Sequence, residues 1–207
     1  MIKKATSILV AVLLPPCILL GQNMSKVIAT QEFNWYGLDF TRAKMIGYEG
    51  FTDPDVLVNK DIHYEWNKKI RKEFKKYDPG KPMGKIAIPY MNVCNNRNKK
   101  VTEEGLIINK SYYLLPKDIK NIINEYPKKK DGDMGLVFIV ESFNKTDEKG
   151  YIWVTFFDER TGQVFVTERL EGNARGFGLV NYWLGAVYHV TKKLKKLYKF
   201  WVKNYGS

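Results

Sequence analysis

Three apolar segments in the second half of the chain decide the fold: Gly135–Phe143 (GLVFIVESF), Tyr151–Asp158 (YIWVTFFD) and Gln163–Leu170 (QVFVTERL). They are rich in β-branched and aromatic residues, which are typical of strands. The connectors Asn144–Gly150 and Glu159–Gly162 are polar, and the second ends in a glycine that suits a tight turn. The pattern predicts a three-stranded antiparallel meander.

Upstream of the meander, strand patterns alternate with helix patterns. Asp53 can cap the free amides of a helix, and Pro54 suits the first helical position, where no N–H is needed. The expected elements are a strand over Asn34–Ile46, a helix from Asp53 to Tyr77, a strand over Lys85–Tyr90, a loop over Asn92–Glu104, a strand over Leu106–Leu115 and a helix over Lys117–Glu125.

A long final helix is expected over Leu179–Asn204. Its apolar residues recur at steps of three and four and form one stripe, while lysines project mainly from the other side. Such a helix either packs its stripe on a sheet or lies on an anionic membrane. We favour core packing. The first long helix carries a second lysine-rich surface, which most often is a solvated face: Lys68, Lys69, Arg71, Lys72, Lys75 and Lys76.

These elements define the expected fold class. Helices that cover one face of a sheet satisfy the order of strands and helices. We predict a single α+β domain with a mixed or mostly antiparallel sheet, a three-stranded C-terminal meander and helices packed mainly on one face.

The N-terminus has the three parts of a secretory signal peptide. Lys3 and Lys4 precede the uncharged segment Ala5–Leu20, and Gly21 and Gln22 offer a small or polar cleavage neighbourhood. The apolar segment is shorter than the roughly 20 residues that span a bilayer, and it contains two consecutive prolines. A cleaved leader is therefore favoured over an uncleaved anchor or a buried first helix.

We predict a signal peptide over residues 1–22 and an exported domain, periplasmic or secreted, over residues 23–207. Acylation of Cys17 as a bacterial lipoprotein is less favoured, because prolines precede it and apolar residues follow it. Cleavage would leave Cys94 as the one thiol of the domain, so no internal disulfide is expected.

The formal net charge of +12 points to anionic partners. Nucleic acid is the usual partner of a basic cytosolic protein, but export argues against it. In an envelope, the abundant anions are lipid headgroups and cell-wall polymers. The expected partners are therefore an envelope protein or an anionic envelope polymer, with no nucleic acid.

The sequence offers little for catalysis or metal binding. His63 and His189 are the only histidines, and no HExxH motif is present. No serine lies in a G-x-S-x-G setting, and no histidine lies near Cys94. We therefore expect no catalytic residues, no metal and no cofactor, and we predict that the protein is not an enzyme.

Carboxylates on or near the meander leave one enzymatic alternative open. Glu141 interrupts an apolar strand, and Asp158, Glu168 and Glu171 lie nearby in the sequence. A pair of them could hydrolyse an envelope glycan or lipid if they met in one cleft. The simpler expectation is that Glu141 faces solvent or pairs with a lysine.

The most unusual segment is Gly172–Gly178 (GNARGFG), which leads into the final helix at Asn181-Tyr182-Trp183. Amides at a helix start can hold an anion, and Arg175 would add positive charge. The glycine spacing fits no nucleotide-binding motif. The segment is either a simple connection or a ligand-binding site, and the predicted ligand-binding residues are Arg175, Asn181, Tyr182 and Trp183.

The turn Asp158–Val164 (DERTGQV) resembles the D-x-x-T-G-x-V turn in α/β domains of the curli secretion lipoprotein and of the amino-terminal part of the TolB translocation protein. The chain is also similar to small exported bacterial envelope proteins of unassigned function, which share a WYGLDF-type first strand and a NYW-type final helix. These resemblances imply a role in envelope assembly and not in catalysis.

The function expected from the sequence is a non-catalytic, exported binding or envelope-assembly module. The first alternative is the glycan or lipid hydrolase described above. The second is peripheral attachment to a membrane through the basic C-terminal helix.

Overall fold

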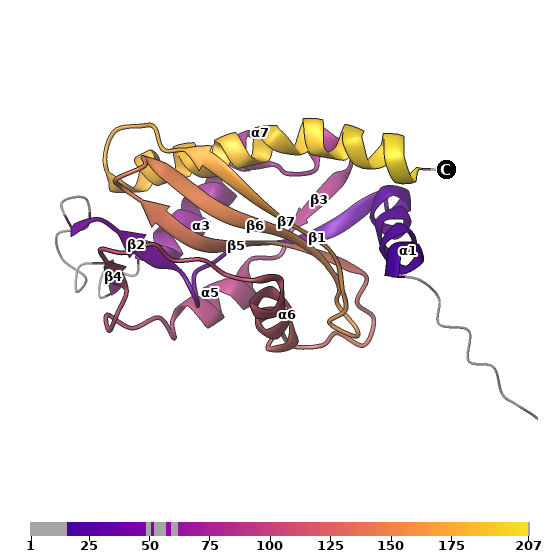
Figure 1. The fold of residues 1–207 in the computed structure, drawn as a ribbon, viewed down its shortest axis with the longest axis horizontal. Coiled ribbons are helices and arrows are strands. Elements are labelled where there is room, and N and C mark those ends of the chain that lie inside the picture. Colours follow the sequence, from indigo (N-terminus) through magenta and orange to yellow (C-terminus); the bar gives the residue numbers. More distant parts are fainter. Residues whose placement is uncertain (1–15, 49–50, 52–56, 59–61, 207) are drawn as a thin grey trace, which may run out of the picture.

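A computed structural model describes residues 16–48, 51, 57–58 and 62–206 of the 207-residue chain (Figure 1). The predicted helix start at Asp53-Pro54 lies outside the described residues. The same is true of the leader up to residue 15.

The described residues form one seven-stranded sheet around the long strand β5. One edge of β5 pairs with β1 along its first half and with β2 along its second half, and the other edge pairs with β6. The strands are β1 (Glu32–Asp39), β2 (Lys44–Ile46), β3 (Ile86–Pro89), β4 (Ile107–Ile108), β5 (Met134–Asn144), β6 (Lys149–Asp158) and β7 (Val164–Asn173).

The sheet is mixed, but the expectation that it is mostly antiparallel is wrong. The pairings β1–β3, β1–β5, β2–β4 and β2–β5 are parallel, and only β5–β6 and β6–β7 are antiparallel. Parallel neighbours require long crossover connections, which helices supply between β1 and β3 and between β3 and β5. The C-terminal meander β5–β6–β7 is confirmed.

Most of the helical residues lie on one face of the sheet, as expected, and two shorter helices cover the other face (Figure 1). The larger apolar cluster lies between the sheet and α1, α3 and α7, and the smaller one lies beneath α5 and α6. The helices are α1 (Pro16–Ala29), α3 (Ile62–Lys72), α4 (Phe74–Tyr77), the 3-10 turn η2 (Lys81–Met83), α5 (Asn92–Asn98), α6 (Pro116–Asn124) and α7 (Leu179–Tyr205).

Helix α5 stands where the sequence predicted a loop. Its polar residues have partners inside the fold: the Asn98 side chain bonds the backbone of Leu38 and Phe40 in and after β1. Asn67 of α3 bonds both backbone groups of Leu38 in the same way. β3 pairs with β1 only as far as Trp35. Beyond that point, these side-chain amides supply the hydrogen bonds that a neighbouring strand would give to the backbone of β1.

The apolar stripe of α7 is buried against the sheet, as the favoured interpretation predicted. Trp183, Val187, Val190, Leu194 and Trp201 are all at most 1% exposed. This stripe is therefore not accessible to a membrane, whereas Phe200 and Val202 near the C-terminal end of the helix are exposed. No helix among the described residues is both long enough and apolar enough to cross a bilayer.

Helix α1 continues across the expected cleavage point after residue 22. Beyond that point, Val27 is fully buried in the main core, with Met24 and Ile28 packed beside it. A mature chain that begins at Asn23 would keep these contacts. The signal peptide and export remain predictions.

Candidate functional site

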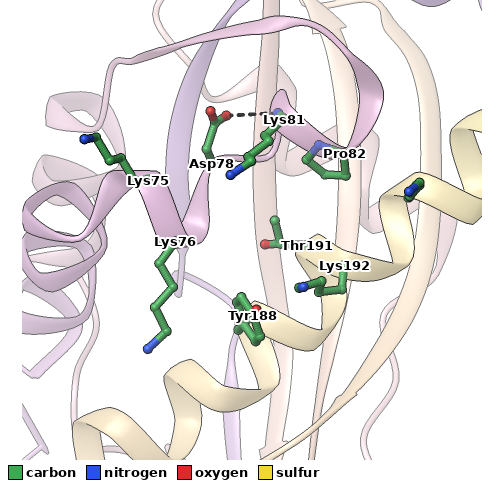
Figure 2. Close-up of a pocket in the computed structure, with 9 residues that line it drawn as sticks. Lys75, Lys76, Asp78, Lys81, Pro82, Tyr188, Thr191 and Lys192 are labelled. Atoms are coloured by element: carbon green, nitrogen blue, oxygen red, sulfur yellow. Dashed lines mark hydrogen bonds between the residues drawn. The ribbon is translucent and has the colours of Figure 1, made fainter.

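A groove of about 350 Å³ opens between the α4–η2 segment and the middle of α7. Figure 2 shows Lys75, Lys76, Asp78, Lys81 and Pro82 on one side of the groove and Tyr188, Thr191 and Lys192 on the other, with the Lys75 side chain extending away from α7. Lys195 completes the lining. The groove therefore joins two segments that lie more than 100 residues apart in the sequence.

The first wall of the groove is shaped by the Asp78-Pro79-Gly80 sequence. The Asp78 carboxylate accepts hydrogen bonds from the backbone N–H of Gly80, at 2.8 Å, and of Lys81, at 3.3 Å. This is an Asx turn, which ends α4 and starts η2. A Cβ on Gly80 would lie 2.4 Å from the carbonyl oxygen of Lys85, so only glycine fits here. The turn thereby fixes the backbone positions of Lys76 and Lys81, which flank it and line the groove.

The second wall is the face of α7 that carries Tyr188, Thr191 and Lys192. The Tyr188 ring packs edge-on against Tyr77, with 6.4 Å between ring centroids. The ammonium groups of Lys192 and Lys76 lie 5.1 Å and 5.9 Å from the centroid of the Tyr188 ring. The aromatic face thus stabilises two cations at once.

The groove carries a large excess of positive charge. Five lysines and one aspartate line it. Lys76 has an acidic partner, since its Nζ lies 3.7 Å from Oε2 of Glu73. The other four lysines of the groove form no ion pair with any residue that the structure describes. Uncompensated lysines that line a hollow attract anions.

The residues predicted as a ligand site lie at the N-terminal end of α7, before and within its first turns, whereas the groove lies along the middle of that helix. Arg175 and Asn181 are exposed, and Tyr182 is half-buried. The Tyr182 hydroxyl accepts a hydrogen bond from Lys145, at 2.9 Å, and donates one to Glu148, at 2.8 Å. Whether these three residues bind a ligand stays a prediction.

Trp183 is a correction to that prediction, because it lies in the core and not on a surface. It is 1% exposed, and its ring stacks on Phe143 with 4.7 Å between centroids and on Phe51 with 5.3 Å. One glycine before it serves close packing, because a Cβ on Gly172 would lie 2.0 Å from the carbonyl oxygen of Ala186. This supports the simpler interpretation of the segment as a connection.

Three of the four carboxylates considered for hydrolysis do not converge, and the fourth, Glu171, forms an ion pair with Lys149 at 3.1 Å. Asp158 pairs with Met134, seven residues along β5 from Glu141, which is roughly 20 Å at the rise of a strand. Glu168 pairs with Val154, whose side chain lies in the larger apolar cluster. Glu168 therefore points to the face of the sheet opposite to the one that carries Glu141. Glu141 is fully buried and forms an ion pair with Arg169, so it does not face solvent and its partner is an arginine.

Neither the histidines nor the acidic residues make a metal site within the described part of the chain. His63 is 2% exposed beside Phe40 and Trp66, and burial lowers its pKa to about 4. The thiol of Cys94 is buried, and burial raises its pKa well above the usual value. These groups belong to the core.

Sequence reasoning identified both basic helices but missed the groove between them. Each helix alone has the pattern of a solvated face. The available signal was that lysines follow the first helix up to the Asp78-Pro79-Gly80 turn and recur along α7. Only the packing of the two segments shows that they face one hollow.

The described residues therefore define a three-layer α/β domain with one strongly basic groove. Comparison of the chain with known protein families, with curated proteins and with solved structures gives no match. The function of the groove is inferred below from its own geometry and charge.

Proposed function

We propose that this protein is a non-catalytic binding module of the bacterial envelope whose lysine groove holds a phosphate-bearing anionic polymer. The observation that carries the proposal is that five lysines, from the α4–η2 segment and α7, line one hollow. The proposal that the protein is exported depends on the N-terminal leader. A place in the envelope is also supported by the resemblance of the Asp158–Val164 turn to turns in envelope domains.

A polymer fits the groove better than a single compact anion does. The lysines are exposed and spread along two elements, and each is a flexible point charge without fixed geometry. Arginine forks would favour one planar ligand, whereas flexible lysines accept phosphates at varied spacings. The binding should therefore be strongly dependent on salt and tolerant of polymer sequence.

The alternatives are weaker on structural grounds. Hydrolysis by Glu141, Asp158 or Glu168 lacks two carboxylates in one cleft. Membrane attachment through the apolar stripe of α7 is disfavoured, because that stripe is buried against the sheet. An electrostatic contact between the basic side of α7 and anionic lipid remains a distinct outcome for experiment.

The test is a titration of the purified protein with linear polyphosphate by isothermal calorimetry at several salt concentrations. The variant Lys75→Glu/Lys192→Glu reverses one unpaired lysine on each wall of the groove. We expect it to weaken binding by at least about tenfold and to lower the slope of log K against log salt by about two, since each phosphate contact contributes about one.

The matched control is Lys117→Glu/Lys120→Glu, which makes the same change in net charge on exposed positions of α6, on the opposite face of the sheet. It should bind polyphosphate nearly as well as the wild type. Equal weakening in both variants would mean that total charge and not the groove governs binding. Binding to anionic vesicles but not to polyphosphate would replace the polymer by a membrane.

A further inference from the structure

A second cavity, of about 300 Å³, opens on the sheet face that carries α5 and α6. It lies over the ends of β5, β6 and β7 and is bordered by residues 111–113, which precede α6. Its volume is at the lower end of the range for small-molecule pockets. None of its lining residues belongs to the lysine groove.

A β-bulge in β5 builds the floor of this cavity. The pairing of β5 with β6 shifts register between Val140 and Ser142, so that Glu141 is the extra residue. Glu141 bonds Trp153 on this face, and Ser142 lines the cavity itself. A regular strand would send two consecutive side chains to opposite faces, whereas a bulge re-aims one of them.

The bulge residue Glu141 fixes Arg169 in the wall. Its carboxylate is fully buried and accepts hydrogen bonds from Arg169 Nη2 at 2.6 Å, from Trp153 Nε1 at 3.0 Å and from the backbone N–H of Leu114 at 3.1 Å. The guanidinium of Arg169 in turn lies 4.5 Å from the ring centroid of Tyr151. The Glu141 carboxylate is therefore fully occupied by contacts within the protein, and the positive charge of Arg169 is already compensated by it.

One polar atom in this wall has no partner. The hydroxyl of Ser142 is buried and forms no hydrogen bond with any described residue, although the residue lines the cavity. Buried polar atoms are almost always hydrogen-bonded in folded proteins. A group that enters the cavity can supply the missing bond.

The charged groups around the cavity carry no excess of positive charge, unlike those of the lysine groove. Arg169 pairs with Glu141, and Glu171 pairs with Lys149 at 3.1 Å. Asp147 accepts hydrogen bonds from Asn144, at 2.8 Å, and from the Tyr151 hydroxyl, at 3.0 Å. An anion would gain little here.

The other features of the lining suit an uncharged, hydroxyl-rich ligand. Ser111 and Ser142 bring hydroxyl groups, whereas the Tyr112 hydroxyl donates to the carbonyl oxygen of Arg42 at 2.9 Å. The side chain of Tyr113 is 66% exposed at the rim. Sugar rings combine hydroxyls at their edges with an apolar C–H face that packs on an aromatic ring. We propose that this cavity binds one or two sugar units of a neutral glycan.

The test uses the full chain labelled with ¹⁵N and titrated with four tetrasaccharides: cellotetraose, maltotetraose, chitotetraose and tetragalacturonate. At least one of the three neutral probes should shift the amide signals of Ser142, Asn144 and Tyr151. Tyr113→Ala should weaken that binding by at least about tenfold. The matched control Tyr64→Ala, at an exposed tyrosine of α3, should leave it unchanged.

Ser142→Ala separates a ligand role from a structural one. Loss of one hydrogen bond to the sugar should weaken binding by about two- to tenfold. The unfolding midpoint of the free protein should stay the same or rise, because the variant removes an unpartnered polar atom. The Lys75→Glu/Lys192→Glu variant should bind the sugar normally, which makes this proposal independent of the polyphosphate result.

Three outcomes would overturn the proposal. The first is that no neutral tetrasaccharide shifts the cavity signals at about 10 mM. The second is that Tyr113→Ala and Ser142→Ala both bind as the wild type does. The third is that only tetragalacturonate binds.

Discussion

Replacement of His63 by leucine should remove a large part of the acid sensitivity of this protein. The imidazole is 2% exposed, packs 4.9 Å from the Phe40 ring and has a buried Nε2 without a hydrogen-bond partner among the described residues. Burial lowers its pKa from 6.5 to about 4 in the folded chain. The neutral ring is therefore the form that the fold accepts.

The sign of the effect follows from the two pKa values. Between pH 6.5 and pH 4 the unfolded chain binds a proton at His63 and the folded chain does not, so the free energy of unfolding falls as the pH falls. Below about pH 4 both states bind the proton, and the effect levels off. At about 1.4 kcal/mol per tenfold change in proton affinity, the whole loss is about 3 kcal/mol.

The assay is urea unfolding of the wild type and of His63→Leu at a series of pH values from 7.5 to 3.5. Other groups titrate in both proteins, so the difference between the two isolates His63. At pH 7.5 the variant should be as stable as the wild type or more so, because it lacks the orphaned nitrogen. Parallel stability curves over the whole pH series would refute the reasoning.

Three further substitutions test the fold and the sites. Gly80→Ala should lower the free energy of unfolding by about 1–3 kcal/mol, measured in urea, since the new Cβ would lie 2.4 Å from a backbone carbonyl oxygen; an unchanged midpoint would refute the close approach. Glu141→Gln should lower the free energy of unfolding by about 2 kcal/mol, because it leaves Arg169 without its carboxylate partner. The cost is limited because the Arg169 side chain is 33% exposed and is partly solvated. An unchanged free energy of unfolding would contradict the ion pair. Trp183→Ala should lower the free energy of unfolding by about 3–5 kcal/mol, whereas Arg175→Ala should change it by less than about 0.5 kcal/mol. A small effect of Trp183→Ala would contradict the burial of this side chain in the core.

The meander and α7 could be predicted from the sequence because each is encoded locally. The strands of the meander are continuous runs of β-branched and aromatic residues, and short polar connectors fix their antiparallel pairing. The stripe of α7 repeats at steps of three and four over its whole length. Neither inference needed a contact between distant segments.

The parallel half of the sheet could not be predicted, because its pairings join residues that lie far apart in the chain. Trp35 pairs with Leu136, and no local pattern gives that register. Helix α5 was missed for a related reason. Its sequence is rich in asparagine, which has a low helix propensity, and the role of Asn98 depends on a hydrogen bond from its amide to the distant carbonyl of Leu38.

The two candidate sites differ in how much the sequence could reveal. The lysines of the groove were visible, but their convergence depends on the packing of the α4–η2 segment on α7. Glu141 was noticed as an acidic residue in an apolar strand, and the structure assigns it to Arg169 within the wall of a cavity. The buried, unpartnered hydroxyl of Ser142 has no signature in the sequence.

The most direct test of the lysine groove is to observe the lysine side chains themselves. Spectra of ¹³C-lysine-labelled protein, recorded during titration with polyphosphate, report on each Cε–Hε group. The signals of Lys75, Lys81 and Lys192 should shift together and saturate, while those of Lys117 and Lys120 on α6 stay fixed. Small, uniform shifts over all lysines, without saturation, would contradict a defined anion site in the groove.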